Sequence, residues 1–341
     1  MSKFKSLGLL TEQFDAAEHV GQARLAEAMG FDSYWVPENY YAMPAAFSTL
    51  GAIAAVTSRI KLGTGVVNPY TRHPVLLGME LAALDQISGG RAILGLDASI
   101  KLWIETQMGM PFDKPLSAVR ETVQILRALL AGETVEHQGR VFKVGAGMRL
   151  AFEPRRTQVP IYIGATGPKA QELAGEIGDG VFPFFSDAGA MASLVERVKI
   201  GATRAGRDAA ACDVSAVVFV SAADDDRAAR DAVKPVLATF FACFANQPEL
   251  PLYAECGLSP TDVAAMREAW TRGEILPDLI SDRAIDLVTV AGNPDRCREK
   301  LAALVAAGLT SPVIYPVMVP GGPEFKDHLD WLLQHVLRDF Y

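Results

Sequence analysis

Short apolar runs alternate with longer stretches in which apolar residues recur every three or four positions. Runs of four to eight apolar residues are typical of buried strands, and a recurrence of three or four is typical of amphipathic helices. Strands are predicted near residues 4–10, 34–36, 60–66, 92–96, 161–163, 181–184, 214–220 and 313–315. Helices are predicted at 15–29, 45–56, 74–88, 115–131 and 168–177 and from residue 294 onward, and a small hairpin at 134–144.

Eight strands separated by helices are what a (β/α)₈ barrel requires. The order therefore predicts an α/β fold of the TIM-barrel type, with residues 1–341 forming a single barrel domain. The helix-rich region 225–288 is too long for one connection between a strand and a helix. We interpret residues 225–288 as a helical insertion after the seventh strand.

Composition and charge narrow the functional classes. Hydrophobic residues make up 50% of the chain and charged residues 21%, and the amino-terminal residues contain no long apolar segment, so we expect a cytoplasmic protein without a membrane partner. The net charge of −8, without a basic run, argues against binding of nucleic acid. The four cysteines are far apart and the histidines lack ligand spacing, so no metal site is expected.

In a barrel of this type the functional groups lie on the loops that follow the carboxyl ends of the strands. That rule selects four loops, at residues 37–41, 65–72, 97–101 and 164–169. Candidate chemistry is therefore sought in these loops.

Two of the loops are rich in glycine. Residues 164–167 lead into a helix, whose amino-terminal N–H groups and dipole favour a phosphate, although an ordinary tight junction would show the same pattern. Gly65 follows an apolar strand and predicts a bulge, either routine or one that a flat ligand approaches. Arg72 and His73 resemble an anion-binding pair, yet His73 precedes Pro74 and is equally suited to capping a helix.

Three segments carry a resemblance to a known family. They are GTGVVNPYTRHP at 63–74, LDQISGGRAILGL at 84–96 and IYIGATGPKAQELAGEIGDGV at 161–181. Together they resemble the bacterial luciferase-like superfamily, in its branch that uses the deazaflavin coenzyme F420, and there most of all the methylenetetrahydromethanopterin reductases. The resemblance implies an oxidoreductase that transfers a hydride between coenzyme F420 and a small organic substrate, which the sequence does not identify.

The resemblance also implies a set of site residues. In such relatives the pair matching Gly65 and Val66 forms a bulge with a non-prolyl cis peptide behind the deazaflavin ring, and the loop matching 164–167 holds the coenzyme's phosphate. The expected cofactor-binding residues are Gly65, Val66, Asn68, Asp97, Ala98, Gly164, Ala165, Thr166 and Gly167. Glu38 and Asn39 occupy the place of an acidic residue and a histidine near the reacting edge of the ring, and are the expected catalytic residues.

The chain departs from the reductases at two positions that matter for proton transfer. Leu10 stands where the reductases carry a glutamate in the first strand. Their G-x-G-x-G-D segment is here Gly95-Leu96-Asp97-Ala98-Ser99-Ile100, so that Ile100 replaces the acid. Glu12 is a possible substitute. Asn39 cannot exchange a proton at neutral pH as a histidine can.

Three other functions remain compatible with the sequence. One is an FMN-dependent monooxygenase of the same superfamily, and another is an NAD(P)H-dependent reductase of a methylene-tetrahydrofolate type. A cofactor-binding barrel without catalysis is the third. We also expect a homodimer or higher homo-oligomer, with the apolar stretch 235–253 either an exposed patch or a core helix.

Overall fold

The structure is a computed structural model that describes residues 3–13, 15–38, 43–184, 187–244 and 251–341. The chain divides into two compact units. One comprises Ser6–Pro183 and Leu194–Ser215, and the other Met1–Lys5, Phe184–Ser193 and Ala216–Tyr341. Asn39, one of the expected catalytic residues, lies outside the described residues.

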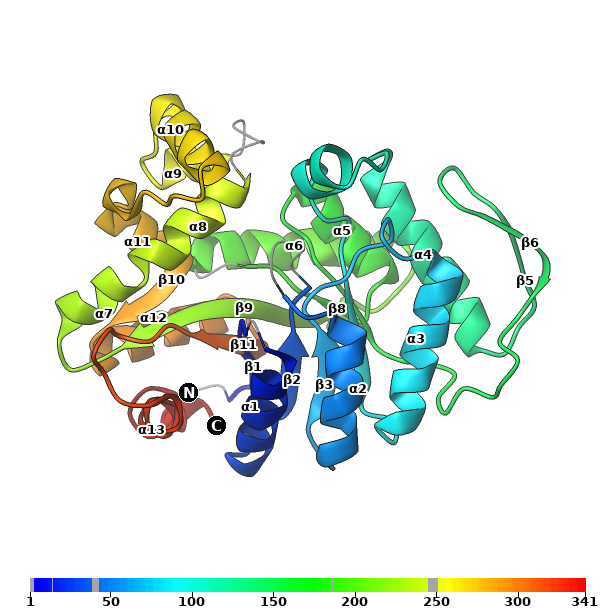
Figure 1. Ribbon diagram of the computed structural model, residues 1–341, viewed down its shortest axis with the longest axis horizontal. Coiled ribbons are helices and arrows are strands. Elements are labelled where there is room, and N and C mark those ends of the chain that lie inside the picture. Colours follow the sequence, from blue (N-terminus) through cyan, green and yellow to red (C-terminus); the bar gives the residue numbers. More distant parts are fainter. Residues whose placement is uncertain (1–2, 14, 39–42, 185–186, 245–250) are drawn as a thin grey trace. The chain divides into compact units, whose positions relative to one another are not determined.

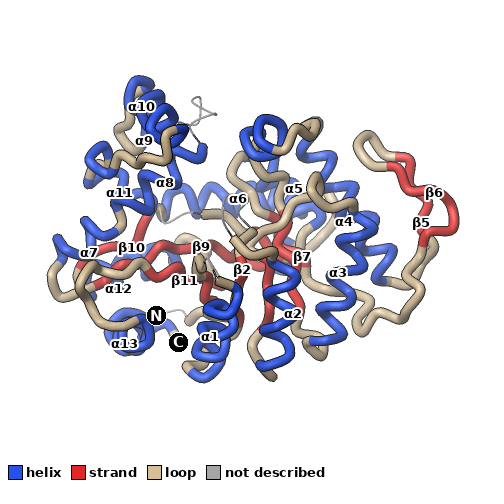
Figure 2. Tube along the Cα trace, viewed as in Figure 1, coloured by secondary structure: helices blue, strands red, loops and turns tan. Residues whose placement is uncertain are grey.

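The first unit holds six strands that pair in parallel (Figures 1 and 2). They are β1 (Gly8–Leu10), β2 (Ser33–Val36), β3 (Lys61–Thr64), β4 (Ala92–Leu96), β7 (Ile161–Ile163) and β8 (Gly180–Val181). Most of their residues are buried, because helices cover the outer side of such a sheet and its own side chains fill the inner side. This two-sided burial explains why the strands appear in the sequence as continuous apolar runs.

Five helices follow these strands, and each packs against the next, as Figure 1 shows. They are α1 (Ala16–Ala28), α2 (Ala46–Val56), α3 (Pro74–Ile87), α4 (Pro115–Leu130) and α5 (Pro168–Ile177). Asp15 caps α1, and prolines occupy the first turn of α3, α4 and α5, where a missing N–H costs nothing. Gly132 ends the turn after α4 at a φ of +78°, a conformation that favours glycine.

Two further elements lie on the connections of this unit. The predicted hairpin is confirmed as β5 (Val135–Gln138) paired antiparallel with β6 (Lys143–Met148). Glu121 of α4 fixes its turn, because its carboxylate accepts N–H hydrogen bonds from Arg140, Val141 and Phe142. A π-helix, η1 (Leu102–Gln107), follows β4 and was not predicted.

The second unit contains most of the remaining elements. Its strands are β9 (Asp213–Ala222), which begins in the first unit, β10 (Thr289–Gly292) and β11 (Ser311–Pro316). Its helices are α7 (Asp226–Ala232), α8 (Lys234–Phe244), α9 (Pro251–Glu255), α10 (Pro260–Thr271), α11 (Asp282–Val288), α12 (Pro294–Ala306) and α13 (Phe325–Leu332). Helix α6 (Ala188–Arg204) has residues in both units.

The described residues of the apolar stretch 235–253 contribute to the core of this second unit. Leu237, Phe241 and Tyr253 are at most 3% exposed and pack in one hydrophobic cluster with residues of α10 and α11. Of its two interpretations, the exposed patch is therefore wrong for the described residues, and the core helix is correct. The oligomeric state stays a prediction.

In hydrogen-bonding order the sheet runs β10-β9-β11-β1-β2-β3-β4-β7-β8, and β8 pairs again with β9. Eight strands therefore form a closed (β/α)₈ barrel, which confirms the predicted fold class, and β10 is an additional strand beside β9. Helices α7 to α11 occupy residues 226–288, and describing that region as an insertion within one domain stays a prediction. No helix in the described part of the chain has the length and apolar character needed to cross a membrane.

Candidate functional site

The exits of β3 and β4 are joined by hydrogen bonds of the Thr64 hydroxyl and of the backbone. Thr64 Oγ1 donates to the carbonyl of Gly95 at 2.8 Å and accepts the N–H of Gly95 at 2.9 Å. Val67 N–H donates to the same carbonyl at 3.0 Å. A Cβ on Gly95 would lie 2.0 Å from the carbonyl oxygen of Thr64, so only glycine permits this approach. Between these bonds the Gly65–Val66 peptide is cis, as the resemblance implied.

Asp97 connects this bulge to the next strand exit. Its N–H donates to the carbonyl of Val67 at 3.0 Å, and Gly164 N–H donates to Leu96 at 2.9 Å. Asp97 Oδ1 accepts the N–H of Ser99 at 2.6 Å. Burial raises the pKa of the Asp97 carboxyl to about 6, against the lowering effect of the Ser99 N–H. The Asp97 carboxyl therefore loses its proton at a higher pH than an ordinary aspartate does.

The loop from Gly164 to Gly167 begins beside Asp97 and ends at the protein surface. Ala165 is 3% exposed, whereas Thr166 and Gly167 are exposed. Gly167 is the N-cap of α5, and no side chain caps that helix. Since the first N–H groups of a helix have no partner within it, this end can bind an anion. Gln171 Nε2 donates to the Thr166 carbonyl at 3.3 Å and helps to hold the loop.

Asn68 performs a structural task in the loop after β3. Its side chain is 1% exposed, and Oδ1 accepts the N–H groups of Tyr70 and Thr71 at 2.9 and 3.0 Å. This Asx turn fixes the path of the chain away from the bulge. The predicted contact between Asn68 and a cofactor ring stays a prediction.

Glu38, which follows β2, is held in an ion pair. Arg72 binds the Glu38 carboxylate through both terminal nitrogens, and Arg72 Nε lies 2.9 Å from Glu80 of α3. Glu38 Oε1 also accepts the N–H of Ala46 at the start of α2 at 3.2 Å. Burial raises the pKa of Glu80, and the charge of Arg72 opposes this rise. Arg72 is thus committed to two carboxylates.

His73 is the N-cap of α3, where its Nδ1 accepts the N–H of Val75 at 3.3 Å. The capping interpretation of His73 is therefore confirmed. With Arg72 paired to Glu38 and Glu80, the two residues do not form an anion-binding pair.

Residues 2–311 match the luciferase-like monooxygenase family. The chain belongs to this family. It is 36% identical to a 5,10-methylenetetrahydromethanopterin reductase from Methanolobus tindarius over 84% of this chain and 86% of that protein. It is 35% identical to the Archaeoglobus fulgidus protein of the same name, over 92% of this chain and 93% of the relative.

A solved structure agrees with these sequence relatives. The coenzyme F420-dependent tetrahydromethanopterin reductase from Methanopyrus kandleri superimposes with a TM-score of 0.86 at 29% identity, covering 100% of both chains. Membership of the luciferase-like family, which the three sequence segments predicted, is confirmed.

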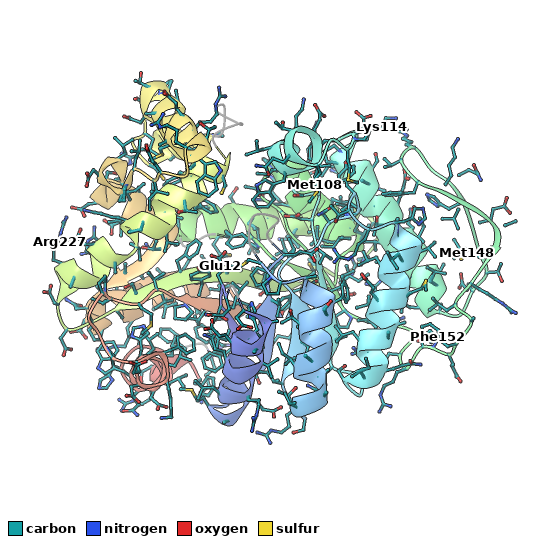
Figure 3. All side chains as sticks on the ribbon, in the orientation of Figure 1. Glu12, Met108, Lys114, Met148, Phe152 and Arg227 are labelled. Atoms are coloured by element: carbon teal, nitrogen blue, oxygen red, sulfur yellow. The ribbon has the colours of Figure 1, made fainter. Side chains whose placement is uncertain are left out.

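Two apolar side chains occupy positions at which the luciferase-like methanopterin reductases are expected to carry acids. Leu10 is 1% exposed, and its Cδ1 would lie 3.0 Å from a Cβ on Gly65. Ile100 is 7% exposed. Glu12, the possible substitute, follows β1 and has an exposed side chain (Figure 3). Beside the bulge, the Leu10 position is therefore apolar.

Sequence reasoning missed the aromatic support beneath the bulge. Trp35 of β2 stacks on Phe182 with ring centroids 4.4 Å apart. A Cβ on Gly63 would lie 2.3 Å from the Trp35 ring, and one on Gly65 would lie 3.8 Å from Phe182. The adjacent glycines of β3 were the signal, because they mark where a large side chain lies against backbone.

A buried polar group on the outer side of the strands was missed as well. Tyr34 OH lies 2.7 Å from Thr11 Oγ1 and 2.9 Å from His19 Nδ1. Burial lowers the pKa of His19 to about 4, so this ring is neutral at physiological pH. The network joins β1 and β2 to α1, in agreement with a structural role for His19.

Of the predicted site residues, the structure brings together those on the exits of β3, β4 and β7. Hydrogen bonds and close contacts join the strand exits that carry Gly65, Val66, Asp97 and Gly164. Ala98, Ala165, Thr166 and Gly167 follow Asp97 and Gly164 directly in the chain. Asn68 and Glu38 lie on neighbouring loops and are bound to other protein groups. In the described part of the chain no cluster of three or more His, Cys, Asp or Glu side chains could hold a metal ion.

Proposed function

We propose that this luciferase-like protein is an oxidoreductase that transfers a hydride between coenzyme F420 and a small organic substrate, as yet unidentified. The structural relative from Methanopyrus kandleri, which covers 100% of both chains, supports the coenzyme because it is a coenzyme F420-dependent reductase. The observation that carries the proposal is the hydrogen-bonded row formed by the exits of β3, β4 and β7, which ends at the uncapped start of α5.

The residues present fit such a coenzyme. At Gly95 a Cβ would collide with the Thr64 carbonyl, and at Gly164 it would collide with Asp97, so glycine is what allows the exits of β3, β4 and β7 to pack closely beneath the proposed site. The proposed phosphate site is residues 164–167, where exposed Thr166 and Gly167 precede a helix of ten residues. The ring would lie at Gly65 and Val66, with Asp97 and Ala98 between the two sites.

The coenzyme supplies the hydride chemistry, and the protein supplies binding, orientation and exclusion of water. Leu10 and Ile100 present buried apolar groups where an acid would otherwise stand, so neither exchanges a proton. Glu38 positions the loops through its pairs with Arg72 and the start of α2. A role of Glu38 and Asn39 at the reacting edge of the ring remains part of the proposal.

Equilibrium binding of oxidised F420 and of FMN, each followed by fluorescence at matched concentrations, tests the coenzyme. We expect tight binding of F420 and weak binding of FMN. The opposite preference would make this protein an FMN-dependent monooxygenase. If neither binds, the remaining candidates are direct use of NAD(P)H, tested by the same titration, and a barrel without catalysis.

Substitution of Gly167 tests the phosphate site. The variant Gly167→Asp places a carboxylate at the N-cap of α5, which stabilises the helix but repels a bound phosphate. Gly167→Asn has nearly the same shape without the charge and is the matched control. We expect Gly167→Asp to weaken F420 binding about tenfold or more relative to Gly167→Asn. Equal affinities of the two variants would exclude a phosphate at this loop.

A further inference from the structure

The segment after β4 contains an acid at an unexpected position. The reductases that this chain resembles carry their acid at the position of Ile100, which here is apolar and 7% exposed. Asp97 stands three residues earlier, at a position where their G-x-G-x-G-D pattern has glycine. In this chain the carboxyl group of the segment therefore lies at the exit of β4.

Asp97 lies between the proposed ring site and the proposed phosphate site. Its N–H binds the carbonyl of Val67, directly after the bulge. On the other side, a Cβ built on Gly164 would lie 2.6 Å from Asp97 Cβ and 3.1 Å from Oδ2. The second carboxyl oxygen thus faces the first residue of the phosphate loop.

The carboxyl has little electrostatic support from the protein. Oδ1 accepts one hydrogen bond, from Ser99 N–H, and Ser99 adopts a φ of +63° in making it. Within the described ranges no ion pair includes Asp97. Burial alone raises the pKa of this carboxyl to about 6, and no charged neighbour contributes to the shift.

The titratable groups of the surrounding elements are few. The exit of β3 presents Val67 and Asn68, and the exit of β7 presents residues 164–167, none of which titrates. On α5 the nearest ionisable residue in sequence is Lys169, which is exposed. On the segment that follows Asp97, Lys101 pairs with Glu105 at 3.2 Å, and both side chains are exposed.

We propose that Asp97 takes up one proton when the anionic coenzyme binds, so that coenzyme affinity falls as pH rises through neutrality. This inference rests on the proposed function. A phosphate bound at residues 164–167 adds a negative charge beside Oδ2, and a like charge favours the neutral carboxylic acid. The proton comes from solvent and forms an O–H bond on the carboxyl, which then donates a hydrogen bond towards the coenzyme and no longer repels it.

The test is the dissociation constant of oxidised F420 between pH 5 and pH 9, measured for the wild type, Asp97→Asn and Glu105→Gln. Asparagine keeps the shape and accepts the Ser99 N–H, but carries no charge. The wild-type dissociation constant should rise by up to about tenfold per pH unit above pH 6 relative to that of Asp97→Asn. The comparison cancels any titration of the coenzyme itself, because both proteins bind the same ligand.

The control Glu105→Gln removes a nearby exposed carboxylate and should keep the wild-type pH profile. Calorimetry in two buffers of different ionisation enthalpy gives a second readout, namely the number of protons taken up on binding by each protein. At pH 7.5 we expect the wild type to take up close to one proton more than Asp97→Asn.

The outcomes separate this inference from the proposed function. If F420 binds to all three proteins with parallel pH profiles, or if the wild type takes up no proton at pH 7.5, Asp97 is not the linked group and the proposed function stands. If F420 binds to none of the proteins at any pH, the proposed function fails and this inference fails with it.

Discussion

Two carboxylates follow strands β2 and β4, which lie on either side of β3 in the barrel, and their surroundings are opposite. Glu38, after β2, is bound by the guanidinium of Arg72 and by the first turn of α2. Asp97, after β4, has one backbone N–H partner and faces the bare Cα of Gly164. Burial raises the pKa of the Asp97 carboxyl to about 6, against the lowering effect of the Ser99 N–H.

The comparison shows that the partner decides what a carboxylate can do at a strand exit. A buried acid beside a cation stays charged and fixes structure, whereas a buried acid without one can hold a proton. Position in the sequence favoured Glu38 as the catalytic residue, and the geometry directs attention to Asp97 for proton exchange.

The largest expected effect comes from removing the cation beside Glu38. In Arg72→Met the carboxylates of Glu38 and Glu80 lose their partner, and we expect the free energy of unfolding to fall by about 3 kcal/mol in urea denaturation at pH 7. Arg227→Ala removes an exposed pair with Asp231 and should cost less than about 1 kcal/mol. If the two variants lost similar amounts of stability, the ion pairs of Arg72 would contribute no more than an exposed ion pair.

The next effect concerns the packing around Asp97. The methyl group of Gly164→Ala would lie 2.6 Å from Asp97 Cβ, so either the loop or the carboxyl must move. We expect a loss of about 2 kcal/mol in the free energy of unfolding, measured in the same way. Gly145→Ala in the hairpin, where a Cβ meets nothing within 4 Å, is the control. If Gly164→Ala were as stable as Gly145→Ala, the Asp97 side chain would not pack against Gly164.

Asp97→Asn should stabilise the protein, in contrast to the other substitutions. Because the folded pKa of about 6 exceeds the ordinary value of 3.8, the folded state binds the proton more tightly than the unfolded state. The charged Asp97 carboxyl therefore lowers the stability of the folded state increasingly between pH 4 and pH 6, and by a constant amount above pH 6. The pKa shift of Asp97 limits the stabilisation by Asp97→Asn to about 3 kcal/mol. Because Asp97 is partly exposed, we expect a gain of about 1.5 kcal/mol in unfolding free energy.

Unfolding free energies of Asp97→Asn and the wild type, measured from pH 3.5 to pH 8, check this expectation. The two curves should coincide below about pH 4 and separate above it, with the variant more stable. A difference that does not change with pH would mean that the Asp97 carboxyl titrates normally.

The smallest effect is expected at the second carboxylate bound to Arg72. Glu80→Gln keeps an acceptor for Arg72 Nε and leaves Glu38 as its charged partner, so we expect a change of only about 0.5 kcal/mol in unfolding free energy. A loss as large as that of Arg72→Met would show that Glu80, and not Glu38, is the main partner of Arg72.

Local patterns in the sequence were sufficient to predict most of the helices and strands and the family. Helices were predicted to begin at residues 74, 168 and 294, and α3, α5 and α12 begin there, each with proline at its first position. These features depend on residues within a few positions of one another. β10 was missed because its four residues, Thr289–Gly292, form a run too short to separate from the helices beside it.

The partners of the candidate site were decided only by the tertiary structure. Arg72 is 34 residues from Glu38, and Gly164 is 67 residues from Asp97, so no local pattern reveals either pairing. Parallel strands place the ends of distant segments side by side, and the charge of a buried carboxyl depends on those neighbours. The sequence by itself therefore determined which loops carry the candidate chemistry, whereas the packing of strand exits decided which carboxylate is committed to an ion pair and which can exchange a proton.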